Sequence, residues 1–292
     1  PPTQGLSMHT LETQYLDILE RATDDTANWV HDTTGRNGAG VYRALIPPHL
    51  DWIVEAGDGF PLLLSKRVPF GVVVAEFCWM MSGRVDVEWL DQYKAAQIWR
   101  PWALSDGTIG RAYGYQIDHP TMGHQVAQAV ERLRLDPTGR RACWTHWRAD
   151  DLPFMALPPC HGCFCQLRVV GGKVHLHMHQ RSGDWCIGIP LNIAFYSLLL
   201  RVCSRLIGQP EGGLHITFGD AHLYEMHFEG AIKQLEQAQE VRRVGKVVPS
   251  LVFRRYDLRE APAAAVFRSL VPGDFELSGY DPMPAIKLGV AV

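Results

Sequence analysis

The sequence predicts a mixed α and β protein, without the regular alternation of strand and helix that is typical of a doubly wound sheet. Two observations lead to this fold class. Apolar residues recur at helical spacing in four separate segments, and two short strand-like runs meet at a Gly-Gly turn. No internal repeat, low-complexity tract or long Pro/Gly/Ser linker divides the chain, so we expect one domain over residues 8–292.

The first half of the chain is predicted to be mainly helical. Apolar side chains in 9–23 have close to helical spacing, and a Gly-rich turn follows at 34–40. The segment 72–81 is apolar with a single acidic residue, as is typical of a buried helix. An amphipathic helix is expected at 124–135, before a turn at 136–139.

The second half combines strands with a further helix. Residues 165–170 and 173–179 are strand-like, and the two glycines between them predict a hairpin. The strongly apolar segment 192–206 predicts a helix, and 214–218 predicts a strand. The most apolar stretch, 187–200, contains Pro, Asn and Ser and is too short to cross a bilayer, so we expect no membrane association.

Composition and charge exclude several classes of protein. Of the 292 residues, 47% are hydrophobic and 20% charged, which is typical of a globular protein with a sizeable core. The net charge is −3 and the basic residues are dispersed, so we expect no nucleic-acid partner. The seven cysteines argue against a secreted disulfide framework and for a reducing compartment. We therefore expect a cytoplasmic protein, in the host cytoplasm if it is phage-encoded; residues 1–7 are set aside as a possible cloning remnant.

Chemically active residues concentrate in one region. Cys160 follows two prolines, and the run Arg181-Ser182-Gly183-Asp184 comes 21 residues later, ahead of Asn192. A thiol nucleophile, an anion clamp, a carboxylate and a primary amide are the parts needed to hold a nucleotide and attack its base. Arg181 is expected to lower the pKa of a nearby thiol.

Two structural alternatives remain for these cysteines. Cys160 alone could be a buried core residue, and Cys160, Cys163 and Cys165 together could form a redox pair or zinc ligands. A zinc site needs about four ligands at suitable spacing, and no second paired cluster is present, so we predict no metal.

Glu76 is the one acidic residue in the apolar segment 72–81. A buried carboxylate is costly unless it is paired or has a chemical task. Burial would raise its pKa toward the range that is useful for proton transfer.

From about Leu11 to Val292 the chain resembles the thymidylate synthase family. The matching residues, in chain order, are 59–63, Ser65-Lys66-Arg67, Glu76, Trp79, Ile98-Trp99, Tyr113-Gly114, Arg140-Arg141, the Cys160 and Arg181 motifs, 219–224, His227 and the tail 279–282. The resemblance implies an α/β subunit with a large mixed sheet flanked by helices. It also implies a homodimer with the sheets back to back and two active sites that each borrow arginines from the partner.

The resemblance assigns roles residue by residue. Cys160 would attack C6 of the pyrimidine, so that C5 becomes carbanion-like and accepts a one-carbon unit from 5,10-methylenetetrahydrofolate. The other implied catalytic residues are Glu76, Asn192, Asp184, Tyr113 and His161. The implied phosphate ligands are Arg181, Ser182, Arg140, Arg141 and Arg36, with Arg140 and Arg141 coming from the partner subunit. The sugar contacts would be His222 and Tyr224, and the folate contacts Trp99, Trp102, Asp184, Gly188 and Val292.

Asn192 favours a uridylate as the substrate. Its amide offers both a donor and an acceptor, which suits O4 and N3–H of uracil, whereas the cytosine-specific relatives tend to carry Asp there. The alternating His175, His177 and His179 could be metal ligands, but no carboxylate partner is visible nearby. They match a strand that the family uses for dimer packing, so we predict interface residues.

Four departures from the family pattern bear on the product. Arg100 stands where the family has Asp, and Asp118 where it has Arg, and we hypothesise that the two form a swapped ion pair. Thr33 replaces an arginine of the N-terminal loop, and 247–251 replaces a proline-rich segment. These changes surround phosphate anchoring, loop closure and the folate side of the pocket.

A looser closure favours water over hydride as the group that reaches the exocyclic methylene intermediate. We therefore predict a dUMP hydroxymethylase, with thymidylate synthase as the alternative and a CMP or dCMP hydroxymethylase as a further one. A catalytically idle relative that binds nucleotide or RNA is disfavoured, because Cys160, Glu76 and Asn192 are all retained.

Overall fold

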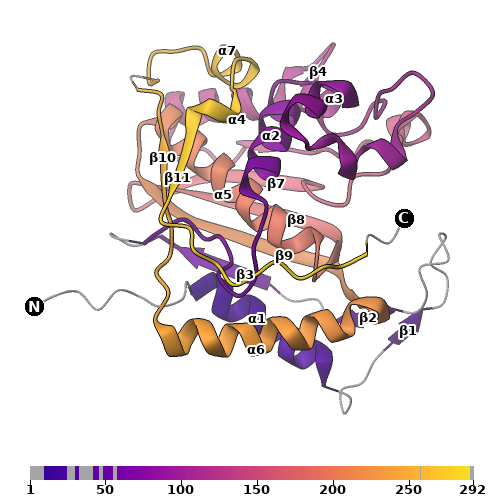
Figure 1. The fold of residues 1–292 in the computed structure, drawn as a ribbon. Helices are drawn as coiled ribbons and strands as arrows, with labels where there is room; N and C mark the ends of the chain where they lie inside the picture. The colour runs from indigo at the N-terminus through magenta and orange to yellow at the C-terminus, as the bar shows by residue number, and fades with distance from the viewer. Residues whose placement is uncertain are drawn as a thin grey trace, which may run out of the picture.

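The computed structural model describes residues 10–24, 30–32, 42–45, 49–54, 58–256 and 258–289. Among them, one mixed sheet organises the structure (Figure 1), with the strand order β1-β2-β9-β8-β7-β6 and β3 also paired to β9. Strands β8 and β9 run parallel, and the other pairs of this sheet are antiparallel. The strands are β1 (Val30–Asp32), β2 (Tyr42–Leu45), β3 (His49–Ile53), β6 (Cys143–Trp144), β7 (Phe164–Val170), β8 (Lys173–Asp184) and β9 (Glu211–Tyr224).

Helices flank this sheet, and Figure 1 shows α1 and α6 together at one end and α2, α4 and α7 at the other. The helices are α1 (Thr10–Thr23), α2 (Phe70–Met81), α3 (Gly114–Ile117), α4 (Gln125–Leu135), α5 (Gly188–Ile207), α6 (Phe228–Val244) and α7 (Ala263–Arg268). Two small antiparallel pairs complete the fold: β4 (Asp118–His119) with β5 (Gly123–His124), and β10 (Ser250–Phe253) with β11 (Phe275–Ser278). The predicted fold class is confirmed.

The four predicted helices are confirmed as α1, α2, α4 and α5, and α6 was not predicted. Strands β8 and β9 continue past their predicted ends, through glycine-containing segments that look like turns in the sequence. These glycines instead allow close packing: a Cβ at Gly183 would lie 2.4 Å from Ile189, and one at Gly219 would lie 2.9 Å from the Arg181 carbonyl. The predicted turn at 34–40 lies outside the described residues.

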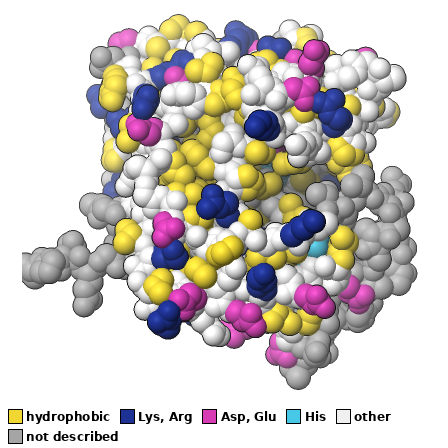
Figure 2. All heavy atoms as spheres, in the orientation of Figure 1, with side chains coloured by type: hydrophobic (Ala, Val, Ile, Leu, Met, Phe, Trp, Pro, Cys, Tyr) yellow, Lys and Arg dark blue, Asp and Glu magenta, His cyan; other side chains and the backbone are white. Residues whose placement is uncertain are grey.

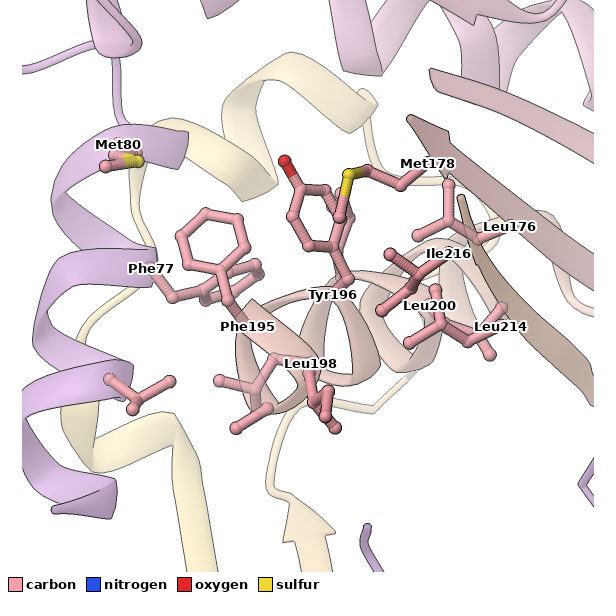
Figure 3. Packing of buried hydrophobic residues seen from close by; sticks show 14 of the residues in the cluster. Phe77, Met80, Leu176, Met178, Phe195, Tyr196, Leu198, Leu200, Leu214 and Ile216 are labelled. Carbon is pink, nitrogen blue, oxygen red and sulfur yellow. The ribbon is translucent and has the colours of Figure 1, made fainter. Parts of the chain in front are cut away.

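The core lies where α5 packs between α2 and the strands β8 and β9 (Figure 3). Phe77 of α2 meets Phe195 of α5 edge to face, with ring centroids 5.2 Å apart. On the other side of α5, Tyr196 and Leu200 lie toward Leu176, Met178, Leu214 and Ile216 of the sheet (Figure 3). By length and composition α5 could span a membrane, but 83% of its apolar window is buried inside the structure.

Charged side chains are mixed on the surface. Figure 2 shows Lys and Arg side chains interspersed with Asp and Glu on the face that it draws. This agrees with the dispersed basic residues in the sequence.

The histidines of β8 contact residues of β9, and one of these, His215, contacts Asp51 of β3. His175 Nδ1 lies 3.4 Å from His215 Nε2, and His215 Nδ1 lies 2.7 Å from a carboxylate oxygen of Asp51. His177 and His179 both contact the Thr217 hydroxyl at 3.1 Å. The expectation that no carboxylate stands near these histidines is wrong, because the β3–β9 pairing brings Asp51 to them. Their place in a dimer interface stays a prediction.

Candidate active site

Cys160 lies in the loop before β7, beside the hydroxyl group of Tyr113. The Cys160 backbone N–H donates to Tyr113 Oη at 3.0 Å, and this oxygen lies 3.3 Å from Cys160 Sγ. Because the tyrosine oxygen already accepts from the amide, its own proton is free to point at the sulfur. Tyr113 can therefore stabilise a thiolate at Cys160.

The backbone at Tyr113 is strained where it reaches the thiol. Its φ of 35° lies in the left-handed region, where a bulky residue is rare. The next residue, Gly114, packs so closely that a Cβ there would lie 2.0 Å from the Arg84 carbonyl oxygen. The segment thus fixes the tyrosine hydroxyl in one place at some cost in stability.

Burial raises the pKa of Cys160 above its usual value. The Tyr113 hydrogen bond and the positive charge of Arg181 oppose this shift without cancelling it, and the Glu76 carboxylate adds to it. Arg181 lowers the pKa of the thiol, as expected, but desolvation outweighs this effect, so the net pKa is raised rather than lowered. The residue as a whole is only partly buried.

Glu76 projects from α2 into the same region. Burial raises the pKa of its carboxyl group to about 7. The nearby Trp99 indole opposes this shift in part, although its N–H is not placed to form a regular hydrogen bond. The side chain is surrounded by protein but keeps partial access to solvent. A carboxyl group with a pKa near neutrality can both accept and donate a proton during turnover.

Arg181 and Ser182 lie near the end of β8, close to the Cys160 loop. Arg181 Nε donates to the Pro159 carbonyl at 3.2 Å, its guanidinium lies 5.5 Å from the centre of the Trp147 ring, and the side chain is exposed. The Ser182 N–H donates to the Cys160 carbonyl at 3.3 Å. The strand end therefore places an arginine and a hydroxyl beside the nucleophile, where an anion could bind.

Asn192 is the fifth residue of α5 and donates to Gln180 Oε1 at 3.1 Å. The Gln180 amide in turn donates to the Ser182 carbonyl at 3.0 Å and is almost fully buried. Gln180 had no predicted role. A glutamine at a buried position of an alternating strand was the available signal, since a buried amide needs partners.

A second polar cluster lies around Asp184. Its carboxylate accepts from the Cys186 N–H at 2.8 Å and lies 3.5 Å from His227 Nδ1, while Lys66 Nζ donates to the Cys186 carbonyl. Burial lowers the pKa of His227, but Asp184 and the Gly289 carbonyl outweigh it, so the net pKa is raised. The Lys66 pKa is lowered by burial.

The ligand atoms of Asp184, Cys186 and His227 lie within 4.8 Å of one another. Lys66 Nζ, which donates to the Cys186 carbonyl, lies next to these three groups. The predicted sugar ligand His222 joins this cluster through its carbonyl, which accepts from the Trp185 N–H at 2.8 Å, and the rings of His222 and Tyr224 meet edge to face at 5.0 Å.

His161 follows Cys160 in the chain, and its side chain is buried. Its Nδ1 is 2.8 Å from Tyr196 Oη, and burial lowers its pKa to about 3, so the imidazole is neutral. The buried His146 ring lies beside it, with ring centroids 6.2 Å apart, and neither of its nitrogens has a hydrogen-bond partner in the described structure.

The remaining predicted residues lie around these clusters or outside the described residues. Trp99 is buried against Trp79 and Tyr113, with centroids 5.4 and 5.5 Å away, and Trp102 is partly exposed. Gly188 begins α5. Arg36 and Val292 lie outside the described residues.

Arg140 and Arg141 are exposed beside the edge strand β6. They line a cavity of about 680 Å³ with residues of the 132–139 segment. No contact of either side chain with Cys160 is found within the described part of the subunit.

The hypothesis of a swapped Arg100–Asp118 ion pair is wrong. Arg100 pairs with Asp91 in the preceding 3₁₀ helix (Val87–Tyr93). Asp118 forms a two-pronged pair with Arg268 of α7 at 2.6 and 2.7 Å. Sequence comparison could not reveal these partners, because Arg268 is 150 residues from Asp118.

A thiol beside an arginine and a hydroxyl donor, with a carboxyl group of pKa near 7, defines an enzyme site for nucleophilic attack and proton transfer. The family model described as Thymidylate synthase matches residues 13–292, so the chain belongs to the thymidylate synthase family. It is therefore a C5 methyl- or hydroxymethyltransferase that uses a folate cofactor and acts on a uridylate. Members of the family bind nucleotide and folate and act as dimers.

Proposed function

We propose that the protein is a dUMP hydroxymethylase. The reaction takes dUMP, 5,10-methylenetetrahydrofolate and water to 5-hydroxymethyl-dUMP and tetrahydrofolate, with no change in the oxidation state of the folate ring. The folate supplies the one-carbon unit. The protein supplies the nucleophile, the anion clamp and the proton transfers.

Cys160 would add to C6 of uracil as a thiolate, helped by the hydrogen bond from Tyr113. Asn192 would hold the O4 and N3–H edge, in an orientation fixed by Gln180. Once C5 carries the one-carbon unit and has lost its proton, the nucleotide has an exocyclic methylene group. Addition of water there and loss of Cys160 from C6 complete the reaction.

Glu76, which matches the thymidylate synthase family, can supply the base that addition of water requires. Its carboxyl group has a pKa of about 7, and the residue as a whole is only partly buried. As a carboxylate it can take a proton from water as that water attacks the methylene carbon, which is the task of a general base with a pKa near the working pH.

The single observation that favours the hydroxymethyl over the methyl product lies on the folate side of the pocket. Arg100 and Asp118 pair with Asp91 and Arg268, so no described ion pair joins the Trp99–Trp102 segment to the residue at 118. Without an ion pair to hold it, the Trp99–Trp102 segment excludes water from the site less completely.

Thymidylate synthesis is the second candidate. It is favoured by Trp99, which is only 6% exposed and packs on Trp79 and Tyr113, because a fixed indole can shield the methylene intermediate from water. A CMP or dCMP substrate is disfavoured, because both the family match and the Asn192 amide favour a uridylate.

We further propose a cytoplasmic homodimer in which Arg140 and Arg141 hold the phosphate bound in the partner subunit. Their exposure, and the absence of a described contact with Cys160 in their own subunit, support this arrangement.

The product can be read directly. Purified protein is incubated with dUMP and 5,10-methylenetetrahydrofolate, the nucleotide is analysed by mass spectrometry and dihydrofolate is followed by absorbance, with dCMP and CMP in parallel. A hydroxymethyl nucleotide without dihydrofolate is expected. A methyl nucleotide with stoichiometric dihydrofolate would establish the second candidate, and Cys160→Ala is the inactive control.

A further inference from the structure

A second thiol accompanies the nucleophile. Cys163 completes the run Cys160-His161-Gly162-Cys163, and its Sγ donates to the Pro159 carbonyl oxygen at 3.4 Å. Arg181 Nε donates to the same oxygen at 3.2 Å. The Pro159 carbonyl group, immediately before Cys160 in the chain, thus accepts hydrogen bonds from both the second thiol and the guanidinium group.

The chain turns sharply between the two cysteines. Gly162 has a φ of 66°, and a Cβ there would lie 2.3 Å from His146 Nδ1 and 2.7 Å from Tyr196 Oη, so only glycine fits. The Cys163 N–H then donates to the His179 carbonyl as β7 begins. The two thiols are close enough to interact electrostatically, and Arg181 lowers the pKa of each, while burial raises both pKa values overall.

Accessibility separates these two cysteines from most of the others. Cys160 and Cys163 are both partly exposed, whereas Cys78, Cys165, Cys186 and Cys203 are buried; Cys143 is also partly exposed. A partly exposed pair at Cys-X-X-Cys spacing beside a cation is the setting in which dithiol and disulfide forms interconvert.

We propose that Cys160 and Cys163 form a reversible intramolecular disulfide that switches the enzyme off under oxidising conditions. The co-reactant is a small-molecule disulfide. The Cys160 thiolate attacks one sulfur of that disulfide and expels a thiol, which leaves a mixed disulfide on Cys160. The Cys163 thiolate then attacks the Cys160 sulfur and expels the second thiol. Two cysteine thiols are oxidised, one external disulfide is reduced to two thiols, and the two cysteine protons pass to the released thiols.

The disulfide would have two consequences. It removes the nucleophile, so turnover stops, and it limits oxidation of Cys160 to a state that a dithiol can reverse. The regulatory meaning rests on the proposed role of Cys160 as the nucleophile, but formation of the disulfide can be measured without any turnover.

Thiol mapping tests the proposal on the full chain. The reduced protein is treated with glutathione disulfide, free thiols are alkylated, and peptides are analysed by mass spectrometry before and after dithiothreitol. We expect the peptide with Cys160 and Cys163 to lose two hydrogens, retain no glutathione, and recover both free thiols on reduction. Activity should disappear and return in parallel.

Two variants sharpen the test. Cys163→Ser should keep glutathione on Cys160, because the resolving thiol is gone, and Cys163→Ala should do the same if the serine protein folds poorly. Cys143→Ser, at another partly exposed cysteine, should behave like the parent protein. A stable glutathione adduct on Cys160 of the parent protein, or a disulfide that joins Cys160 to any other cysteine, would overturn the proposal. Failure of the reduced protein to modify dUMP would refute the proposed function but leave the disulfide result unaffected.

Discussion

Replacing Glu76 by glutamine should make the protein more stable while it removes activity. The carboxyl pKa rises from 4.5 to about 7 in the folded state, so the folded protein binds more protons than the unfolded chain between these values. Its stability therefore falls as the pH rises through this window. A shift of that size corresponds to about 3 kcal/mol, and partial access to solvent reduces the expected effect to roughly 1–3 kcal/mol.

Glutamine has the shape of the neutral acid and carries no charge at any pH. The free energy of unfolding, from urea titrations between about pH 4.5 and pH 8, should differ little between Glu76→Gln and the parent protein at the acidic end. Above pH 7 the variant should be more stable by roughly 1–3 kcal/mol. Glu88→Gln, at an exposed glutamate, is the matched control and should show no such trend.

A Glu76→Gln protein whose stability tracks that of the parent at every pH would refute the reasoning, because the buried charge would then carry no penalty. So would a variant that is less stable above pH 7. The same carboxyl group should give kcat/KM an inflection near pH 7 in the parent enzyme.

Three further predictions concern the nucleophile, the base edge and the corrected ion pair. Tyr113→Phe removes the hydrogen bond to the thiolate and should slow iodoacetamide alkylation of the active-site thiol at neutral pH roughly 10- to 100-fold; an unchanged rate would separate the tyrosine from thiol activation. Asn192→Asp should raise kcat/KM for dCMP relative to dUMP roughly 10- to 100-fold, and an unchanged ratio in competition assays would show that another group reads the base. A double-mutant cycle of Asp118→Asn with Arg268→Gln should give a coupling energy of about 0.5–1 kcal/mol, because the pair is partly exposed, whereas the cycle with Arg100 should give none.

Local sequence patterns predicted most of the fold. The helices α1, α2, α4 and α5 and the β7–β8 hairpin follow from hydrophobic periodicity and a Gly-Gly turn. The predicted strands were too short. Gly183 and Gly219 are needed for close packing between β8, β9 and α5, but in the sequence they cannot be told from glycines that form turns.

Tertiary contacts account for what the sequence did not predict at the site. The raised pKa of Cys160 depends on how much protein surrounds it, and no motif encodes that desolvation. The partner of Asp118 and the carboxylate beside His215 come from residues far away in the chain. Gln180 could have been noticed as a buried amide, but its link to Asn192 requires the strand and the helix to be placed together.

The most direct test of the account is the source of the new oxygen. We would run the reaction of dUMP with 5,10-methylenetetrahydrofolate in heavy-oxygen water and weigh the nucleotide product. Attack of water on the methylene group predicts a hydroxymethyl nucleotide that carries the heavy isotope, with tetrahydrofolate left unoxidised. An unlabelled methyl nucleotide formed together with dihydrofolate would contradict it and make hydride transfer the last step in this enzyme.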